Sequence, residues 1–536
     1  MKASKTNLFL IAIFLLGLAV RVSLFLHEDF IGDLGGAVYA RLGRNLIQAG
    51  HYAFGEDYNQ GIIMPPGYPI FIGLTNLLIK DLLISGKAVS LLFSLATIIL
   101  FYFVGGNLGG KNVGLFSALG FAIYPFILRT SALVASEATF IFFFFLSFYF
   151  FLLLQKKARI LNAILFGILS AYTFLIRPEG FALLLLPVLF WRRISKNFFK
   201  IFVILVIFAL GVSPYLLYLK QSTGKFILSG KGAMNYLEGE SFLGADLEKI
   251  THSLNKEKTR MAIFEAVTET SVLDQAFRHP GRLMKKYAAN FREETGWLFL
   301  LSVPVLFPLL FSFFSSDLLK NKLKLSLIFL FLFLVFILPL FFIKVQYTYS
   351  MISLLILIAS PGFQNSNGAL AGVLNFFAAK RTRFIAWLEK RMKFLVIVFL
   401  ILSSLFYIVF LFVGEKDIPV EHIQAALFLK KMSPGYERIN VMARKPWASF
   451  YSDARYTSLP DATWSDIIHF AKLYAVDFIV IDERTLGQRK NYDELIQLDK
   501  YTKEAELAYQ DHSGKLIKIF KVINPRDGSR DLPPAL

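Results

Sequence analysis

The chain has 536 residues, of which 56% are hydrophobic and 18% charged, and its mean hydropathy is +0.56. These values exclude a set of ordinary soluble domains, because runs such as FIFFFFLSFYFFLLL approach the roughly 20 apolar residues that cross a bilayer. The net charge of +19 does not indicate nucleic-acid binding, since no such motif is present and cytoplasmic loops collect Lys and Arg. The sequence therefore predicts a polytopic α-helical membrane protein.

The first apolar segment follows Lys2 and Lys5 and continues to Leu26 with no cleavage site of small residues. We interpret it as an uncleaved first span rather than a signal peptide. The sequence contains no cysteine, which excludes disulfides, thiol catalysis and cysteine-ligated zinc. The histidines show no metal-binding spacing, and we predict neither a metal site nor a cofactor.

Apolar length predicts about eleven membrane spans. Basic residues gather on every second loop, which predicts a cytoplasmic N-terminus and a C-terminus on the outer face of the inner (plasma) membrane. The segment 68–80 is too short to cross and is expected to lie at the outer interface. The predicted spans are 7–26, 86–104, 112–128, 138–154, 160–176, 179–191, 200–218, 296–315, 325–343, 346–360 and 394–413.

This topology predicts a transmembrane domain, 1–413, with outer loops at 27–85 and 219–295, and an extracytoplasmic tail, 414–536. The tail alternates helical and strand patterns, which indicates a small α/β domain. Its expected elements are a helix around 420–432, the strand RINVMA, the helix WSDIIHFAKLYA, and the strands DFIVIDE and KLIKIFKV.

The opening loop carries the strongest signal for a site. In AVYARLGRNLIQAG, Val38, Leu42 and Leu46 recur at helical spacing while Arg41 points elsewhere, which predicts an amphipathic helix lying on the membrane. The following PPGYP, which contains Tyr68, is a rigid turn into the next short helix. Together the two segments would frame a cleft at the membrane surface.

Asp33 lies at the mouth of this expected cleft among glycines, which lack the bulk to keep a substrate away. An ionised aspartate there could remove the proton from an attacking hydroxyl. The alternative is that the acids of this loop only keep it solvated, and we favour that alternative for Glu56 and Asp57 but not for Asp33.

Two further positions place charge near the outer ends of spans. Glu137 is followed by unbroken apolar sequence, and a carboxylate at such depth is costly and suggests function. Arg129 is its possible partner, and the alternative is an interfacial side chain that reaches water. Arg177, in LIRPEGF, could bind a lipid-linked phosphate through paired hydrogen bonds. The alternative for Arg177 is an ion pair with Glu179.

The stretch TGKFILSGKG supplies Lys225 and Lys231 as candidate phosphate contacts. It is not a nucleotide-binding loop, because the glycine spacing is wrong and glycine rather than serine or threonine follows Lys231.

Taken in order, Asp33, PPGYP, Ser136-Glu137, RPEG and TGKFILSGKG resemble the GT-C membrane glycosyltransferases, especially the bacterial relatives of protein mannosyltransferases and of the lipid A aminoarabinose transferase. The tail stretches VMARKPWASFYSDARYTSLPDA and VDFIVIDERTL look like the periplasmic domain of many bacterial members. The chain departs from the family pattern at two points: Leu34 stands where many members have a second acid, and Gln346 where many have arginine.

The resemblance implies inverting transfer of a sugar from a polyprenyl-phosphate carrier to an acceptor hydroxyl on an envelope lipid, glycan or protein. It maps the catalytic acid to Asp33, and Glu28, Asp29 or Glu137 would supply any second carboxylate. The substrate-binding candidates are Arg177, Glu179, Lys231, Lys225, Arg41 and Tyr68. The expected partners are the lipid-linked donor, the acceptor and membrane lipids, without nucleic acid.

Two other classes of function remain open at this point. A transporter or flippase would need a polar pathway through the bundle, whereas charged residues in the predicted spans are few and lie toward the outer ends. A non-catalytic scaffold would use the tail to bind a partner.

Overall fold

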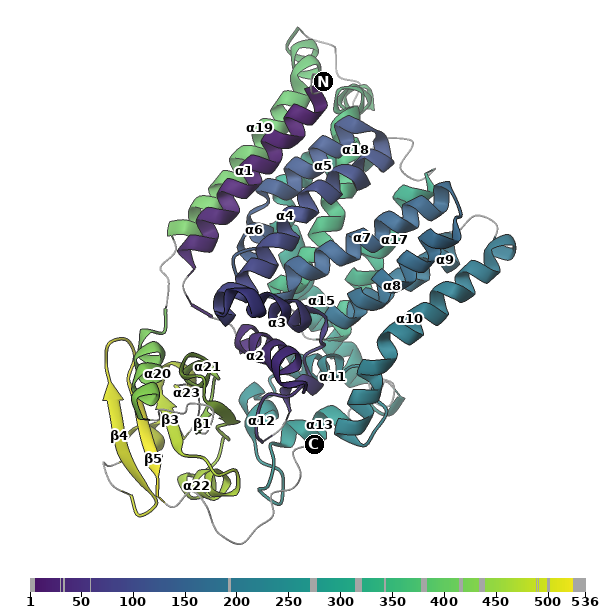
Figure 1. Ribbon diagram of the computed structural model, residues 1–536. Helices are drawn as coiled ribbons and strands as arrows, with labels where there is room; N and C mark the ends of the chain where they lie inside the picture. Colours follow the sequence, from purple (N-terminus) through teal and green to yellow (C-terminus); the bar gives the residue numbers. More distant parts are fainter. Residues whose placement is uncertain are drawn as a thin grey trace. The chain divides into compact units, whose positions relative to one another are not determined.

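The computed structural model describes residues 5–523 except 29, 32–33, 58, 191–193, 270–276, 314–320, 342–343, 377–382, 414–417, 433–438, 488, 490 and 499–501. Helices dominate the described residues, and one small sheet lies toward the C-terminus (Figure 1). The chain divides into two compact units. We call them the helical unit, which contains Met1–Asp29, Lys87–Pro214 and Tyr287–Glu415, and the loop–tail unit, which contains Phe30–Gly86, Tyr215–Lys286 and Lys416–Leu536.

Within the described residues, eight helical segments are long and apolar enough to cross a membrane. They are α1 (Lys5–His27), α4 (Leu82–Gly109), α7 (Ser136–Lys156), Phe198–Thr223 of α10 (Ile194–Thr223), the run from α15 (Pro280–Ser302) through α16 (Leu306–Phe313), α17 (Lys322–Ile337) with its 3-10 extension, Val345–Gln364 leading into α18 (Tyr349–Phe376), and Arg391–Val409 of α19 (Arg383–Val413). The predicted helical membrane architecture is thereby confirmed.

Three shorter apolar helical segments fall on the remaining predicted spans. They are α5 (Lys111–Ile123), α8 (Ile160–Ile176) and the run Pro178–Phe190, which joins the 3-10 helix η2 (Pro178–Leu184) to α9 (Leu185–Phe190). All three are shorter than the roughly 20 residues that a straight crossing needs. The count of eleven spans therefore stays a prediction.

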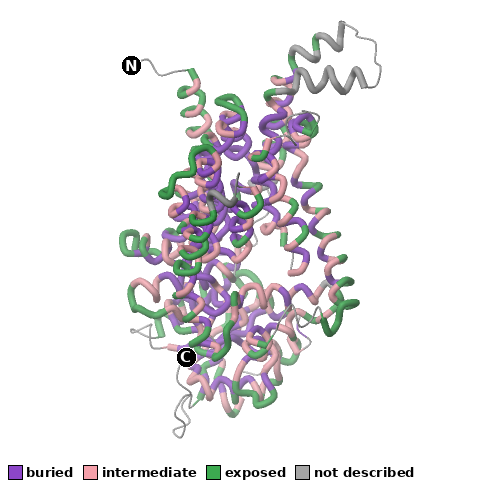
Figure 2. The backbone as a smooth tube through the Cα atoms, turned by 90° about the vertical axis from the view of Figure 1, so that its right-hand side faces the viewer, coloured by how far each residue is buried: buried purple, intermediate pink, exposed green. Residues whose placement is uncertain are grey.

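Helix α18 lies in the interior of the helical unit. Its membrane-length segment is 89% buried, compared with 17% for that of α1. Helices α5, α16, α17 and α19 pack around it. In Figure 2, buried positions run through the bundle and exposed positions lie toward its outside. The membrane-length segment of α18 also has the lowest mean hydropathy of the eight segments, 1.2, which fits contact with other helices rather than with lipid.

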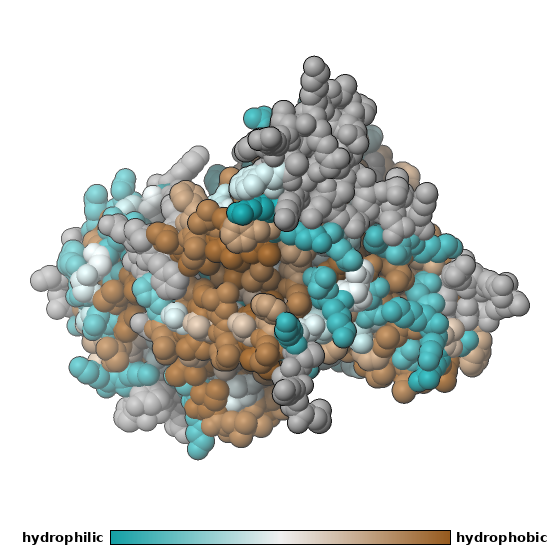
Figure 3. All heavy atoms as spheres, turned by 90° about the horizontal axis from the view of Figure 1, so that it is seen from above, coloured by the Kyte–Doolittle hydropathy of each residue, from teal (hydrophilic) through white to brown (hydrophobic). Residues whose placement is uncertain are grey.

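Large apolar side chains remain exposed on the outer helices. Examples are Leu8 and Phe9 in α1 and Leu402 and Phe406 in α19, each more than half exposed. Figure 3 shows hydrophobic side chains covering a broad area of one face. Water-soluble proteins seldom expose contiguous apolar patches above about 300–600 Å². These exposed apolar side chains fit contact with lipid.

The loop–tail unit contains the two short helices expected after the first span, α2 (Leu34–Ala49) and α3 (Gly67–Ile79). Their backbones cross in direct contact, because a Cβ added to Gly43 would lie 2.3 Å from the Pro69 carbonyl oxygen, and one added to Gly73 would lie 2.2 Å from the Gly43 carbonyl oxygen. Only glycine fits at either position. Gly50, with φ +73°, follows the last residue of α2, as is common after a helix C-terminus.

The tail is an α/β domain, as predicted. Its sheet has the order β2-β1-β3-β5-β4, with β2, β1 and β3 parallel and β3, β5 and β4 antiparallel. Helix α20 (Val420–Met432) packs on β4 and β5, and α21 (Trp447–Ser452) contacts β1. The strands are β1 (Asn440–Ala443), β2 (Arg455–Ser458), β3 (Phe478–Asp482), β4 (Ala505–Asp511) and β5 (Ile517–Val522), and α22 (Trp464–Leu473) precedes β3.

Helix α2 does not lie on the membrane with the apolar face that the sequence suggested. Val38 and Leu42 are fully buried and belong to one hydrophobic core with Val441 of β1 and Val480 of β3. That expectation was wrong because helical periodicity identifies an apolar face but not the surface that covers it. The tail, rather than lipid, buries these side chains.

The second loop that the sequence places outside, 219–295, is also joined to the tail. Glu248 of α12 (Leu247–His252) accepts hydrogen bonds from Arg444 at 2.7 Å and from Arg489 at 2.6 Å. Burial opposes ionisation of the Glu248 carboxyl, but the two guanidinium groups outweigh it and lower its pKa. Segments from both of these loops and the tail therefore form one compact unit.

Candidate functional site

Asp33 and Asp29 lie outside the described residues. Asp33 directly precedes Leu34, the first residue of α2. The assignment of Asp33 as catalytic base therefore remains a prediction.

The helical unit brings together three of the predicted site residues. Glu137 lies in the first turn of α7, Arg177 follows the last residue of α8, and Glu179 lies in the first turn of η2. Arg177 Nη1 donates to Glu137 Oε1 at 3.0 Å, and Nε donates to Glu179 Oε1 at 2.6 Å. We call these three residues the Arg177 cluster. The ion pair with Glu179, the alternative role for Arg177, is present. Arg177 rather than Arg129 pairs with Glu137.

The Arg177 cluster is buried and lined by aromatic rings. The side chains of Arg177, Glu137 and Glu179 are 3%, 11% and 10% exposed. The guanidinium carbon lies 4.6 Å from the centre of the Tyr347 ring and 5.5 Å from that of Phe140. Two carboxylates and one guanidinium give a formal charge of −1 when both acids are ionised, so only the guanidinium of this cluster could contact a phosphate.

The loop–tail unit brings together a second set. Lys231, at the start of α11 (Gly230–Glu238), donates from Nζ to Tyr39 Oη at 3.0 Å. The rings of Tyr39 and Tyr68 meet edge to face with centres 5.4 Å apart, and Tyr68 Oη donates to the Gly86 carbonyl at 3.0 Å. We call Lys231, Tyr39 and Tyr68 the Lys231 cluster. It places an ammonium group and two phenols within one small volume.

Backbone packing fixes the position of Lys231. A Cβ on the preceding Gly230 would lie 2.3 Å from the Ile62 carbonyl oxygen, so only glycine allows α11 to approach the opening loop this closely. Ser229 caps the helix by accepting a hydrogen bond from the Gly232 amide at 3.1 Å. The glycines of the SGKG stretch therefore bring a lysine to Tyr39 instead of forming a nucleotide loop.

The other two lysine and arginine candidates have different surroundings. Lys225 is exposed and pairs loosely with Glu269 at 3.5 Å, a surface contact of little energetic value. Arg41 is only 2% exposed, and its guanidinium donates to the Asp453 carboxylate and to the Ser449 carbonyl at 2.8 Å. Arg41 thus binds the tail. The sequence patterns did not identify Asp453 as this partner, because it is one of several acids in the tail and nothing in the stretch SDARY marks it.

The interpretation of Asp57 as a solvated acid was wrong. Its side chain is 4% exposed, and Oδ1 accepts a hydrogen bond from the Ser458 amide at 3.1 Å. Glu56 is more open and lies 3.7 Å from Arg455. The loop containing both acids packs on β2 of the tail, which no local pattern could reveal.

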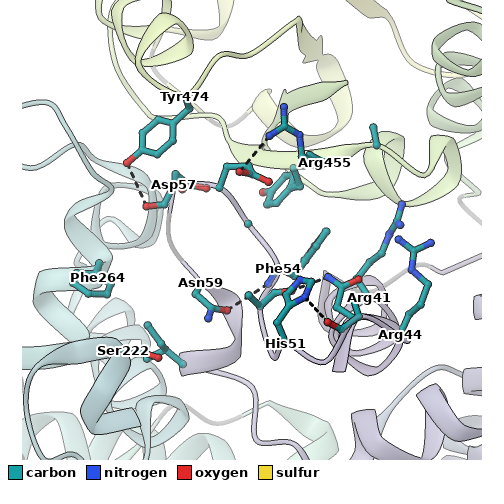
Figure 4. A pocket seen from close by; sticks show the side chains of 18 of the residues that line it. Arg41, Arg44, His51, Phe54, Asp57, Asn59, Ser222, Phe264, Arg455 and Tyr474 are labelled. Atoms are coloured by element: carbon teal, nitrogen blue, oxygen red, sulfur yellow. Dashed lines mark hydrogen bonds and ion pairs between the residues drawn. The ribbon is translucent and has the colours of Figure 1, made fainter. Parts of the chain in front are cut away.

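A cavity of about 430 Å³ opens within the loop–tail unit (Figure 4). Its walls come from the end of α2, the loop that follows it, the end of α10, the segment leading into α13 (Ala262–Glu269), and the tail around β2. We call it the loop–tail cavity. The polar and aromatic residues that line it are Arg41, Arg44, Asn45, His51, Phe54, Glu56, Asp57, Asn59, Ser222, Arg260, Phe264, Asp453, Arg455, Tyr456 and Tyr474.

Among the residues that the structure describes, no three His, Asp or Glu side chains gather into a possible metal site. The described clusters instead offer carboxylates, an ammonium group and guanidinium groups. Such groups can move a proton and stabilise a leaving phosphate.

The family model described as dolichyl-phosphate-mannose-protein mannosyltransferase matches residues 64–218. The matched segment includes the whole Arg177 cluster and begins after Asp33. No curated protein matches the chain.

Solved structures of two membrane glycosyltransferases have a similar fold. ArnT from Cupriavidus metallidurans bound to undecaprenyl phosphate is 11% identical, with a TM-score of 0.59 over 96% of this chain and 98% of that chain. ArnT from the same organism in the apo state is 10% identical, with a TM-score of 0.61 over 96% of this chain and 98% of that chain. The oligosaccharyltransferase AglB from Archaeoglobus fulgidus, in complex with an inhibitory peptide and a dolichol-phosphate, is 10% identical. Its TM-score is 0.58, over 90% of this chain and 70% of that chain.

These identities carry the fold alone, and that fold is the GT-C fold expected from the motifs. Together with the family match, it indicates a membrane glycosyltransferase.

Proposed function

We propose that the chain transfers a sugar from a polyprenyl-phosphate carrier to an acceptor hydroxyl. The observation that carries the proposal is the coincidence of the mannosyltransferase match, 64–218, with the Arg177 cluster. That segment contains a buried guanidinium and two carboxylates, and buried charge within a membrane domain suggests function.

In this proposal Asp33 removes the proton from the acceptor hydroxyl as its oxygen attacks the anomeric carbon. The new carbon–oxygen bond forms on the face opposite the leaving group, and the electron pair of the old bond departs on the polyprenyl phosphate. This single displacement inverts the anomeric carbon. The protonated Asp33 then releases its proton to water.

Lys231 and Arg177 are the proposed cationic contacts of the donor phosphate. The Lys231 ammonium is fixed by Tyr39, and the Arg177 guanidinium is planar and can form paired hydrogen bonds. Positive charge beside the leaving oxygen lowers the barrier to bond breaking. Glu137 and Glu179 would hold the guanidinium in orientation.

The proposed donor class draws support from the ligands of the structures with a similar fold. Undecaprenyl phosphate is bound to ArnT, and a dolichol-phosphate to AglB. A carrier with a lipid tail also suits a chain whose outer helices expose large apolar side chains. We place the reaction on the outer face of the inner membrane, with the N-terminus in the cytoplasm.

Purified full-length protein incubated with radiolabelled polyprenyl-phosphate sugars and an envelope extract tests this function. Transfer of label to an envelope component, with release of polyprenyl phosphate, is the expected result. Movement of intact labelled carrier across proteoliposome membranes without bond cleavage would instead indicate a flippase. If the protein neither cleaves nor moves the carrier, a non-catalytic scaffold becomes the better interpretation.

A further inference from the structure

The loop–tail cavity is a second candidate binding place, and its size suits a small hydrophilic ligand. Its volume of about 430 Å³ lies within the range of about 300–1,000 Å³ that small-molecule sites occupy. All its described lining residues belong to one compact unit.

The charges that line the cavity nearly compensate one another. Its described lining contains four arginines and three carboxylates, a formal charge of +1 with His51 neutral. Arg41 and Arg44 share the Asp453 carboxylate, and Arg455 lies 3.7 Å from Glu56. Such a surface presents fixed donors and acceptors together, whereas a polyanion would require an excess of cations.

Aromatic rings supply the apolar part of the wall. Phe54 and Tyr456 stack on each other at the base of the wall and are only 7% and 2% exposed. Phe264 and Tyr474 are the lining rings that remain partly exposed. The Arg260 guanidinium carbon lies 5.6 Å from the centre of the Phe264 ring. Figure 4 shows Phe54, Phe264 and Tyr474 around the same space as the charged side chains. Flat apolar surface beside paired donors and acceptors matches a sugar ring, which has C–H faces and a hydroxyl rim.

The cavity adjoins the Lys231 cluster through the opening loop. Ile62 lines the cavity, and its carbonyl oxygen is the atom that a Cβ on Gly230 would meet at 2.3 Å. Tyr215 Oη also donates to this carbonyl, at 3.3 Å. The backbone of Ile62 would therefore separate a ligand in the cavity from the first turn of α11, which carries Lys231.

From these observations we infer that the loop–tail cavity binds the saccharide part of the acceptor, and that this saccharide is neutral or weakly charged. The inference rests on the proposed glycosyl transfer and adds the acceptor class to it. It favours a glycan or a glycolipid headgroup over a peptide, whose extended backbone would need an open strand edge or groove. The edge strand beside the cavity, β2, is already covered, because the Glu56 amide donates to the Tyr456 carbonyl and the Ser458 amide donates to Asp57.

The inference is tested by measuring the binding of fluorophore-labelled, detergent-solubilised full-length protein to an array of saccharides and peptides. The array carries neutral, N-acetylated, uronic-acid and phosphorylated oligosaccharides beside Ser-, Thr- and Asn-containing peptides. We expect binding to neutral or N-acetylated saccharides. Binding only to peptides, only to strongly anionic saccharides, or to nothing on the array overturns the inference.

Two cavity variants locate the binding on the molecule. Arg260→Gln removes a charged donor and Phe264→Ala removes a ring. Each variant should bind the saccharide selected on the array with about tenfold lower affinity, while its affinity for the lipid-linked donor stays unchanged. Lys256→Gln is the matched control, because Lys256 is exposed on the same segment and does not line the cavity. Unchanged saccharide affinity in both cavity variants would contradict the inference.

Failure of the proposed function gives a different result. Wild-type protein that never cleaves the labelled donor refutes the transfer reaction whatever the array shows. Wild-type protein that cleaves the donor, with cavity variants whose acceptor KM equals that of wild type, refutes only the acceptor site. The circular dichroism and thermal unfolding of each variant are compared with those of wild type so that a misfolded variant is not counted.

Discussion

Arg41 of α2 is buried against the tail and donates to the carboxylate of Asp453, which also accepts from Arg44 of the same helix. Arg41 donates in addition to the Ser449 carbonyl at 2.8 Å. Since α2 begins one residue after Asp33 and carries Tyr39, this contact links the tail to the helix on which the proposed chemistry depends.

Asp453→Asn should therefore lower both stability and transfer. The variant leaves the buried Arg41 guanidinium without its anionic partner, and we expect a loss of about 1–3 kcal/mol in the free energy of unfolding. Thermal unfolding and turnover measure the two effects. Asp493→Asn, an exposed acid of the same tail, serves as the control and should match wild type.

The same pair predicts a pH dependence. Burial opposes ionisation of the Asp453 carboxyl, but Arg41 and Arg44 outweigh it and hold its pKa below the usual value of 3.8. A lowered folded pKa means that the stabilisation is complete above the unfolded pKa of about 3.9 and disappears as the pH falls through the folded value. Acid titrations of wild type and Asp453→Asn should converge in stability at low pH. Parallel curves would show that Asp453 makes no such contribution.

Arg177→Ala should abolish most transfer, and Arg177→Lys should recover only part of it, because an ammonium cannot form the paired hydrogen bonds of a guanidinium. The Ala variant also leaves Glu137 and Glu179 buried without a counter-charge, which costs about 3–5 kcal/mol in comparable ion pairs. The triple variant with Glu137→Gln and Glu179→Gln removes this penalty. A triple variant that is stable and fully active would exclude Arg177 from donor binding.

Asp33→Asn should lower turnover by about 10²–10⁴-fold, the usual value of a general base, while donor binding survives. Turnover and donor affinity are measured on the same preparation. Asp493→Asn, an exposed acid of the tail outside the loop–tail cavity, serves as the control. Near-normal turnover in Asp33→Asn would move the assignment to Glu137, and loss of donor binding would give Asp33 a structural role.

Lys231→Met keeps most of the apolar stem and removes the charge, so donor affinity should fall. A charge-assisted hydrogen bond of about 1.5–3 kcal/mol corresponds to roughly 10- to 150-fold in the dissociation constant. Tyr39→Phe keeps the ring beside Lys231 and removes only the hydroxyl, and it should stay within a few-fold of wild type. If both variants lose donor affinity equally, the hydrogen bond rather than the charge is what matters.

Reporter fusions test the predicted orientation. Fusions after Lys324 and Lys393 should report the cytoplasm, and fusions after Gly239 and Leu536 the outside, because basic loops are retained on the cytoplasmic side. A cytoplasmic signal from the fusion at Leu536 would change the number of spans and place the tail on the other side of the membrane.

The sequence alone determined the features that depend on local patterns. Long apolar runs were enough for the membrane helices, since each helix satisfies its own backbone hydrogen bonds. Alternating helical and strand patterns were enough to predict the α/β tail. They did not predict β2, whose sequence RYTS is polar, or β4, whose sequence AELAYQD is mixed. Glycine spacing likewise excluded a nucleotide loop before the fold was known.

Only the tertiary structure decided which surfaces and charges meet. Glu137 and Arg177 are 40 positions apart, and Arg41 and Asp453 are 412 apart, so no periodicity relates either pair. The apolar face of α2 was visible from spacing, but its partner, the tail rather than lipid, was not. The burial of Asp57 arose from the same cause. A local pattern shows that a side chain needs a partner, whereas the long-range path of the chain determines which partner it finds.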